Sequence, residues 1–136
     1  MKQLIKTLKI ITKGQGFYEF TSDIVKLVNK IKNGLLTIYV KHTSCSLLIQ
    51  ENADSDVQKD LLNFFSKIVP ENKNYIHQSE GSDDMPAHIK SALTNNQISL
   101  SIRDSKLLLG TWQGIYLFEH RLHPTKRTIV LHFMGE

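Results

Sequence analysis

The sequence is poor in cysteine: Cys45 is the one cysteine among its 136 residues. An internal disulfide is therefore excluded, and a reducing compartment is expected. No apolar run approaches the roughly 20 residues that a membrane-spanning helix needs. The N-terminus also lacks the apolar run and small-residue cleavage site of a signal peptide. These absences predict a cytoplasmic protein with no membrane segment.

The sequence also lacks runs of lysine or arginine, although its net charge is +4. A mild positive charge suits phosphorylated small molecules as well as nucleic acid and is not evidence for either, but the absence of a basic stripe does not favour nucleic-acid binding. The partner that we expect is a phosphorylated small molecule. Hydrophobic residues make up 40% of the chain and charged residues 22%, which is typical of a globular protein. A chain of this length predicts a single domain spanning residues 1–136.

Apolar and β-branched residues, often alternating with polar ones, predict strands. These strands are expected at residues 2–11, 17–20, 35–40, 75–78, 98–102, 107–121 and 128–134. Helical spacing predicts three helices. They are expected from an N-cap at Ser22 to Asn33-Gly34, from Ser55 to Pro70, and after Asp84. This order is not a regular βαβ alternation, so we predict an α+β fold, mainly an antiparallel sheet or sandwich with two to three helices.

The strand predicted at residues 35–40 is apolar on one face, and that face turns polar at its end. Continued period-two counting places three polar residues there: His42, Ser44 and Ser46. A neutral imidazole ligates metals and moves protons near neutral pH, so His42 is a candidate site residue. Glu51 and Asp54 follow and offer carboxylates. The alternatives stay open: His42 as a buried core histidine, and Asp54 as a helix cap.

Residues 77–88 contain two histidines and three acidic residues, Glu80, Asp83 and Asp84, within twelve positions. A histidine before the glycine turn, His77, and one at the helix start, His88, are placed to converge there. The spacing matches no zinc finger and no His-Glu-x-x-His helix. The alternative is a solvated acidic loop with a capping aspartate.

The segment 109–121 is apolar on both faces, which predicts a central strand. A carboxylate in such a strand is costly unless it is paired or bound to a cation, so Glu119 is a site candidate. An ion pair with Arg121 or Arg127 is the alternative. Trp112 and Gln113 are candidates for stacking on a ring and hydrogen bonding to it, although a strand tryptophan is more often a core residue.

Taken in order, several short motifs resemble those of one family. They are His42-Thr43-Ser44, Glu51-Asn52-Ala53-Asp54, Asp56-Val57, Val69-Pro70-Glu71, Tyr75-Ile76-His77, Glu80-Gly81, Pro86-Ala87-His88-Ile89-Lys90, Leu109-Gly110-Thr111-Trp112-Gln113-Gly114-Ile115, Glu119, and the closing Met134-Gly135-Glu136. Together they resemble the YjbQ-like family, named the secondary thiamine-phosphate synthase enzyme family. The resemblance implies a compact α+β domain, often assembled as a homotrimer.

The resemblance also implies a metal site formed by His42, His77 and His88. Histidine ligands favour zinc or a similar ion, with magnesium as the alternative. The family name implies the joining of hydroxymethylpyrimidine diphosphate to thiazole phosphate, as a secondary activity. On that basis the acidic candidates for catalysis are Glu51, Asp83 and Glu119, while Trp112 and Gln113 would contact the ring. Two further hypotheses remain: a metal-dependent hydrolase of a phosphorylated metabolite, and a non-catalytic module that binds a metal or small ligand.

Overall fold

The helices and strands come from a computed structural model that describes residues 1–72 and 74–136. The strands are β1 (Lys2–Ile11), β2 (Gly16–Glu19), β3 (Gly34–Val40), β4 (Cys45–Glu51), β5 (Gln97–Arg103), β6 (Lys106–Leu107), β7 (Gln113–Glu119) and β8 (Lys126–Gly135). The helices are α1 (Thr21–Val28), α2 (Ser55–Ile68) and α3 (Asp84–Leu93). The predicted α+β class, with a mainly antiparallel sheet architecture and up to three helices, is confirmed.

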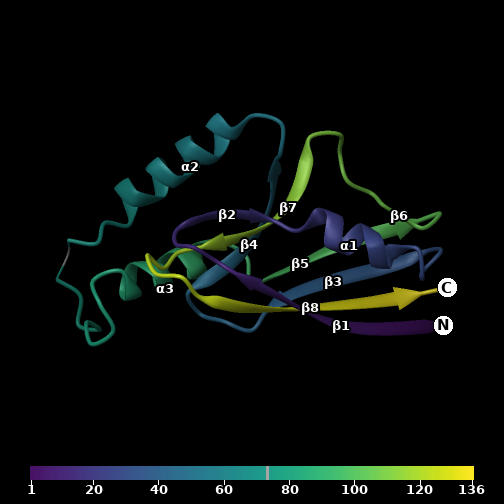
Figure 1. The fold of residues 1–136 in the computed structure, drawn as a ribbon, viewed down its shortest axis with the longest axis horizontal. Coiled ribbons are helices and arrows are strands. Elements are labelled where there is room, and N and C mark those ends of the chain that lie inside the picture. Colours follow the sequence, from purple (N-terminus) through teal and green to yellow (C-terminus); the bar gives the residue numbers. More distant parts are fainter. Residues whose placement is uncertain (73) are drawn as a thin grey trace.

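The larger sheet has five strands in the order β1-β8-β3-β5-β6. The long strands β1 and β8 pair antiparallel, from Lys2 opposite Gly135 to Ile11 opposite Lys126. This register brings the two chain ends together at one end of the molecule (Figure 1). The described part of the segment between α2 and α3 lies at the opposite end.

The smaller sheet has three strands in the order β2-β7-β4. Its central strand, β7, is buried from Gly114 to Glu119. A strand covered on both faces reads as a continuous apolar run, which explains why both sides of this segment are apolar in sequence. The prediction of a central strand is therefore confirmed.

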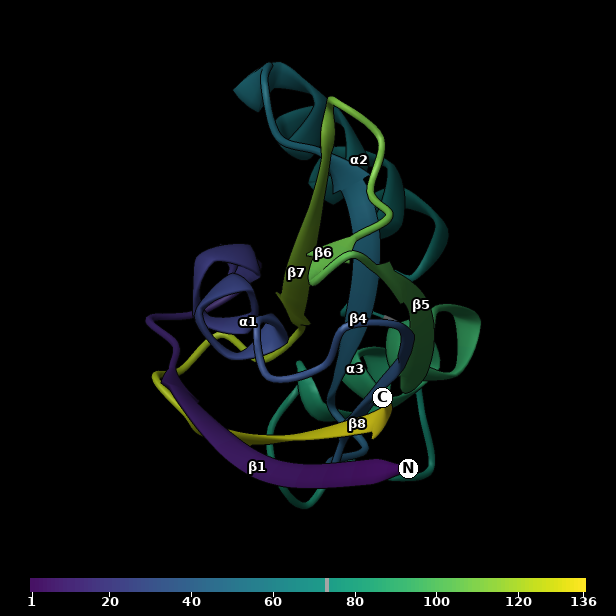
Figure 2. The same ribbon diagram turned by 90° about the vertical axis from the view of Figure 1, so that its right-hand side faces the viewer.

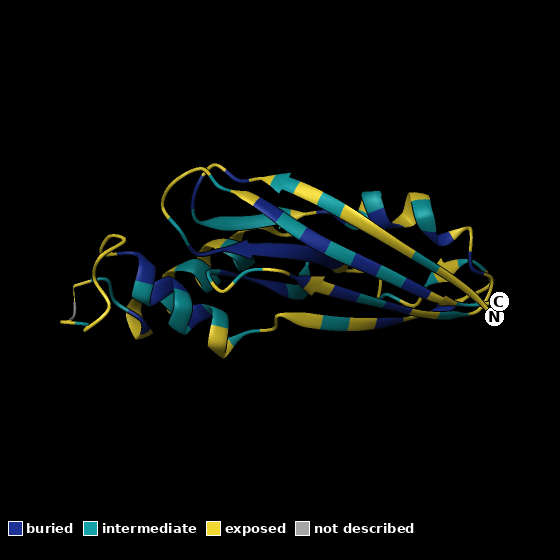
Figure 3. Ribbon diagram, turned by 90° about the horizontal axis from the view of Figure 1, so that it is seen from below, coloured by how far each residue is buried: buried dark blue, intermediate teal, exposed yellow. Residues whose placement is uncertain are grey.

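The hydrophobic core lies between the two sheets, and α1 closes one side of it (Figure 2). Along β3 the residues with inward side chains are buried, as the period-two pattern predicted, and buried and exposed bands alternate along the long strands (Figure 3). The core residues include Ile24, Leu36, Ile38, Val40, Leu47, Ile115, Leu117, Ile129, Leu131 and Phe133. No helix among the described residues is long and apolar enough to cross a membrane.

The strand predicted over residues 107–121 is wrong as a single element. It is divided into β6 and β7 by a loop at residues 108–112. Gly110 lies in that loop and donates its N–H to Gln113 Oε1 at 2.8 Å. Gly114 is a close-approach point, because a Cβ there would lie 2.6 Å from the Glu19 carboxylate. The apolar pattern continues across the loop, so the sequence pattern predicted one strand instead of two.

Three other local predictions are wrong. Residues 75–78 form no strand, since Tyr75 instead donates its hydroxyl to the Pro70 carbonyl at 2.9 Å. Ser22 is not the N-cap: the first helix begins at Thr21 and ends at Val28, before the predicted stop at 33–34. The strand ending in Val40 also does not continue through His42.

Candidate metal centre

Helix α3 places an aspartate and a histidine on one face. Asp84 is its first residue and His88 follows one turn later, and residues four apart on a helix are neighbours. Gly81, with φ of 106°, allows the turn just before the helix. The preceding segment brings His77 over the same spot, so His77, Asp84 and His88 have ligand atoms within 4.8 Å of one another.

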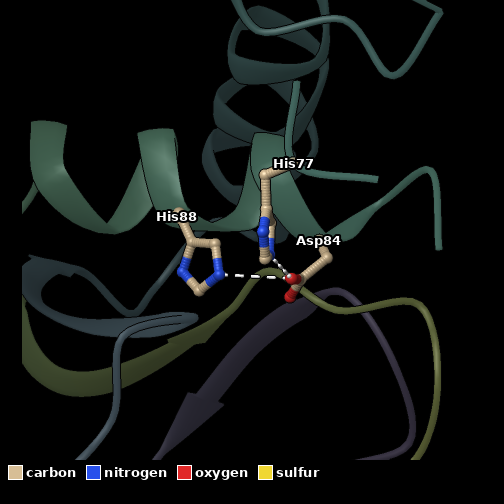
Figure 4. A group of neighbouring side chains, drawn as sticks. All are labelled: His77, Asp84 and His88. Carbon is tan, nitrogen blue, oxygen red and sulfur yellow. Dashed lines mark hydrogen bonds and ion pairs between the residues drawn. The ribbon is translucent and has the colours of Figure 1, made fainter. Parts of the chain in front are cut away.

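The two imidazoles converge on one carboxylate oxygen (Figure 4). Asp84 Oδ2 lies 2.6 Å from His77 Nε2 and 3.2 Å from His88 Nε2. Asp84 is 1% exposed, whereas the His77 side chain is 45% exposed. The cluster therefore has a buried carboxylate at its base and an open side toward solvent.

Arg121, in the loop after β7, holds the base of the cluster. Its Nη1 donates to Asp84 Oδ1 at 2.7 Å, and its Nε donates to Asp83 Oδ2 at 2.9 Å. Its Nη2 donates to the Glu80 carbonyl at 2.9 Å. A planar guanidinium with several donors fixes the orientation of both carboxylates. Because Oδ1 of Asp84 is occupied in this way, Oδ2 is turned toward the histidines.

Both aspartates are held in the charged form. Burial acts to raise the pKa of Asp84, but the hydrogen bond from His77 and the charge of Arg121 outweigh it and the pKa is lowered. Burial likewise opposes ionisation of Asp83, whose pKa is lowered by the Leu122 N–H and by Arg121. The same carboxylates raise the pKa of Arg121 against the opposing effect of its burial.

Three pockets adjoin the cluster. One has a volume of about 250 Å³ and is lined by residues that include Glu71, Tyr75 and His77. The second, of about 260 Å³, is lined by residues that include His42 and His88. The third, of about 590 Å³, also adjoins His77. Small molecules can therefore approach the cluster from two sides.

The third predicted ligand, His42, faces His88 across the second pocket and does not join the cluster. Its Nε2 accepts a hydrogen bond from the Thr128 N–H at 2.7 Å. A neutral ring with this nitrogen as acceptor carries its proton on Nδ1, so neither nitrogen offers a free lone pair. Burial and the charge of Arg127 lower the pKa of His42. The structure groups His77 and His88 with Asp84 instead.

The predicted catalytic acids lie in three different places. Asp83 adjoins the cluster but is bound by Arg121 and by the Leu122 N–H. Glu119 is fully buried and pairs with Arg127, which is the alternative that the sequence left open. Glu51 lies at the far end of β4, about 20 Å along the strand from Cys45.

The predicted ring-contacting residues lie near Glu51, away from the cluster. Gln113 is opposite Glu51 in the sheet register. Its side-chain oxygen is occupied by the Gly110 N–H. Trp112 is 63% exposed in the adjoining loop. Sequence reasoning missed Asp84 and Arg121 as site residues, although the four-residue spacing of Asp84 and His88 was a usable signal.

Fold and site together define a two-sheet α+β protein with a His–Asp–His cluster at the start of its third helix. Residues 6–136 match the family model described as UPF0047 protein YjbQ-like. The chain belongs to this family, as its order of short motifs predicted.

The chain is similar to its relatives over nearly its whole length. UPF0047 protein sll1880 of Synechocystis sp. is 48% identical over 138 residues, covering 99% of this chain and 94% of that protein. UPF0047 protein YjbQ of Escherichia coli O157:H7 is 41% identical, covering 96% and 97%. The crystal structure of a YjbQ/UPF0047 family protein from Clostridium acetobutylicum matches with a TM-score of 0.85 and 32% identity, covering 96% and 99% of the two chains.

Proposed function

We propose that His77, Asp84 and His88 bind a divalent metal ion and that the protein is a metal-dependent enzyme acting on a phosphorylated small molecule. The observation that carries this proposal is the convergence of two imidazole Nε2 atoms on one buried carboxylate oxygen. Two histidines and a carboxylate are ligands that suit zinc and similar ions better than magnesium, which prefers oxygen.

The hydrogen bonding of His88 fits a cation. Its Nδ1 lies 2.8 Å from the Thr43 carbonyl, which can only accept, so Nδ1 carries a proton. A neutral His88 then presents the Nε2 lone pair to Asp84 Oδ2, and two acceptor atoms face each other at 3.2 Å. A bound cation satisfies both, as does a second proton on His88. An imidazole whose other nitrogen donates to a carbonyl is the usual arrangement for a histidine ligand.

The three side chains leave room for further ligands, as catalytic metal sites do. A divalent ion supplies Lewis acidity toward a phosphate oxygen and activates water. Arg121 and the Thr43 carbonyl fix the orientation of Asp84 and His88. The flanking pockets admit a small substrate. Hydrolysis of a phosphate ester is the reaction that this arrangement supports best.

Thiamine-phosphate synthesis is a second candidate. The same cation would neutralise the negative charge that develops on the departing diphosphate when hydroxymethylpyrimidine diphosphate joins thiazole phosphate. This candidate rests on the family name that the motifs at His77 and at His88 suggested in the sequence, whereas the matching family model names no activity. The two reactions differ in stoichiometry, because only the synthase needs a second substrate.

The test is turnover by the zinc-loaded protein. Phosphate release from a panel of phosphate monoesters, without any second substrate, is expected and should fall at least a hundredfold in His88→Ala. The synthase candidate requires instead that diphosphate release from hydroxymethylpyrimidine diphosphate depend on added thiazole phosphate. If the protein binds metal but shows no turnover in either assay, the enzyme proposal is wrong and the non-catalytic, ligand-binding function remains.

We also propose that the chain assembles as a homotrimer, the state that the family resemblance implies, and that α2 forms the interface. This helix has an apolar side, yet none of its residues is buried, and Phe64 and Ile68 are 55% and 50% exposed. In Figure 1 α2 extends along the outside of the sheets. An exposed apolar helix face indicates a protein interface. Cytoplasmic location remains part of the proposal, since the buried Cys45 forms no disulfide.

The trimer predicts a mass by light scattering near three times that of the chain. Phe64→Glu is expected to shift the protein to the monomer, because a carboxylate in an apolar interface is costly. Asn63→Glu, at the neighbouring exposed position, is the matched control and should leave the mass unchanged. A monomeric wild-type protein would contradict this assembly.

A further inference from the structure

Lys90 is a buried cation that the proposed metal site does not use. It lies on α3, two residues beyond His88, and is 5% exposed. It forms no ion pair with any residue that the structure describes. Lysine is seldom this deeply buried without a partner, because removing an ammonium from water is costly. The residue therefore reduces stability unless something in its surroundings compensates for the cost.

Lys90 lines a pocket of about 440 Å³ between the end of α2 and α3. The other lining residues are Ser66, Val69, Pro70, Glu71 and Asn72. Among the described side chains, His120 Nδ1 is the single fully buried polar atom without a hydrogen-bond partner. The Lys90 ammonium is not among the fully buried atoms without a partner, and Lys90 lines the pocket. Its charged end is therefore accessible from the pocket.

The two carboxylates that attract Lys90 at longer range, Glu71 and Asp83, already have other partners. Asp83 is bound by Arg121, and Glu71 Oε1 accepts from Gln15 Nε2 at 3.3 Å. Glu71 also lines the pocket that contains His77. The Lys90 pocket and the pocket of the metal cluster therefore adjoin at Glu71.

We propose that the Lys90 pocket binds the phosphoryl group of a small molecule, with the Lys90 ammonium as its counter-ion. The inference deepens the proposed function and rests on its phosphorylated substrate. A compact ammonium is a common ligand for phosphate oxygens. Ser66 and Asn72 add polar groups to the wall of the pocket. The phosphoryl group would thus be anchored beside the cluster formed by His77, Asp84 and His88.

The test is titration calorimetry of the full-length protein with inorganic phosphate, at ionic strength held constant with chloride. Saturable binding is expected in the wild type. Lys90→Met keeps the aliphatic stem and should weaken binding by about tenfold to a hundredfold, the effect of losing a charge-assisted contact. Lys90→Arg should retain most of the affinity. Lys67→Met, which removes an exposed lysine of α2, is the matched control and should bind like the wild type.

One further variant and one further titration separate this inference from the metal proposal. Glu71→Gln should strengthen phosphate binding several-fold, because it removes a like charge from the pocket wall. The chelator-treated, metal-free wild type should still bind phosphate saturably, and Lys90→Met should weaken this binding as well. A parallel titration with phenyl phosphate distinguishes a site for phosphate esters from a site for free phosphate. Binding of both phenyl phosphate and inorganic phosphate supports a substrate ester, whereas binding of inorganic phosphate alone supports a free-phosphate site.

The inference is overturned if Lys90→Met binds phosphate as tightly as the wild type, or if phosphate binds no better than chloride. Denaturation experiments also test whether Lys90 has a structural role. Lys90→Met should be at least as stable as the wild type, because it removes a buried, unpaired charge. A marked loss of stability in that variant, with phosphate binding unchanged, would assign Lys90 to the fold.

Discussion

Replacing Arg127 by methionine is expected to destabilise the protein by about 3–5 kcal/mol, since it leaves a buried carboxylate without its partner. Glu119 is fully buried and Arg127 is 3% exposed. Arg127 Nε lies 3.0 and 2.9 Å from the two oxygens of Glu119, and Nη2 lies 2.5 Å from Oε2. Thr12 donates to Glu119 Oε1 at 2.8 Å. The pair therefore connects β7 with β8, one strand from each sheet.

Urea denaturation at neutral pH measures this loss. Lys126→Met, at the exposed neighbouring position, is the control and should change the free energy of unfolding by less than about 0.5 kcal/mol. The double variant Glu119→Leu with Arg127→Met should recover much of the loss, because no unpaired charge remains. A cost below about 1 kcal/mol for Arg127→Met would mean that water or another group reaches Glu119.

Glu119 shows which features of the protein could be predicted from the sequence and which could not. Its strand was correctly predicted as central, because buried strands read as apolar on both faces. A carboxylate there had to be paired or bound to a cation, and sequence alone could not choose between the two. The choice depends on Arg127, eight residues away along the chain but on a strand of the other sheet. Only the packing of the two sheets settles it.

The element boundaries that failed share a physical cause. Residues 108–112 continue the apolar pattern of the strands on either side, and Gly110 alone does not distinguish a loop from a bulge within a strand. Residues 75–78 have strand-like composition but no neighbouring strand to pair with, and a hydrogen bond from Tyr75 to Pro70 holds them instead. Strand propensity reflects the surroundings of a segment more than its residues.

The candidate site was predicted in part. The spacing of His77 and His88 around a glycine turn indicated convergence, and the structure brings these two side chains together. The resemblance implied His42 as the third ligand, whereas the structure has Asp84 in the cluster. His42 and His88 are far apart in sequence, so their relative placement depends on the docking of α3 against the start of β4. Asp84 was interpreted only as the start of a helix.

Removing Asp84 or His88 is expected to lower zinc affinity by more than about a hundredfold, because partners that merely orient a ligand already contribute about 10–100-fold. The variants Asp84→Asn and His88→Ala test this. Arg121→Gln is expected to cost about 10–100-fold, since it holds Asp84 Oδ1 without being a ligand itself. Competition with a chromophoric chelator measures each affinity.

His42→Ala is the variant that separates the two possible ligand sets. With His77, Asp84 and His88 as ligands, it should change zinc affinity by less than about tenfold, because His42 Nε2 is occupied by the Thr128 N–H. A loss as large as that of His88→Ala would mean that His42 gives up this hydrogen bond and turns across the shared pocket to the metal. Zinc binding unaffected by Asp84→Asn, His77→Ala and His88→Ala alike would contradict both sets, and the cluster would then be a hydrogen-bonded network around a buried aspartate.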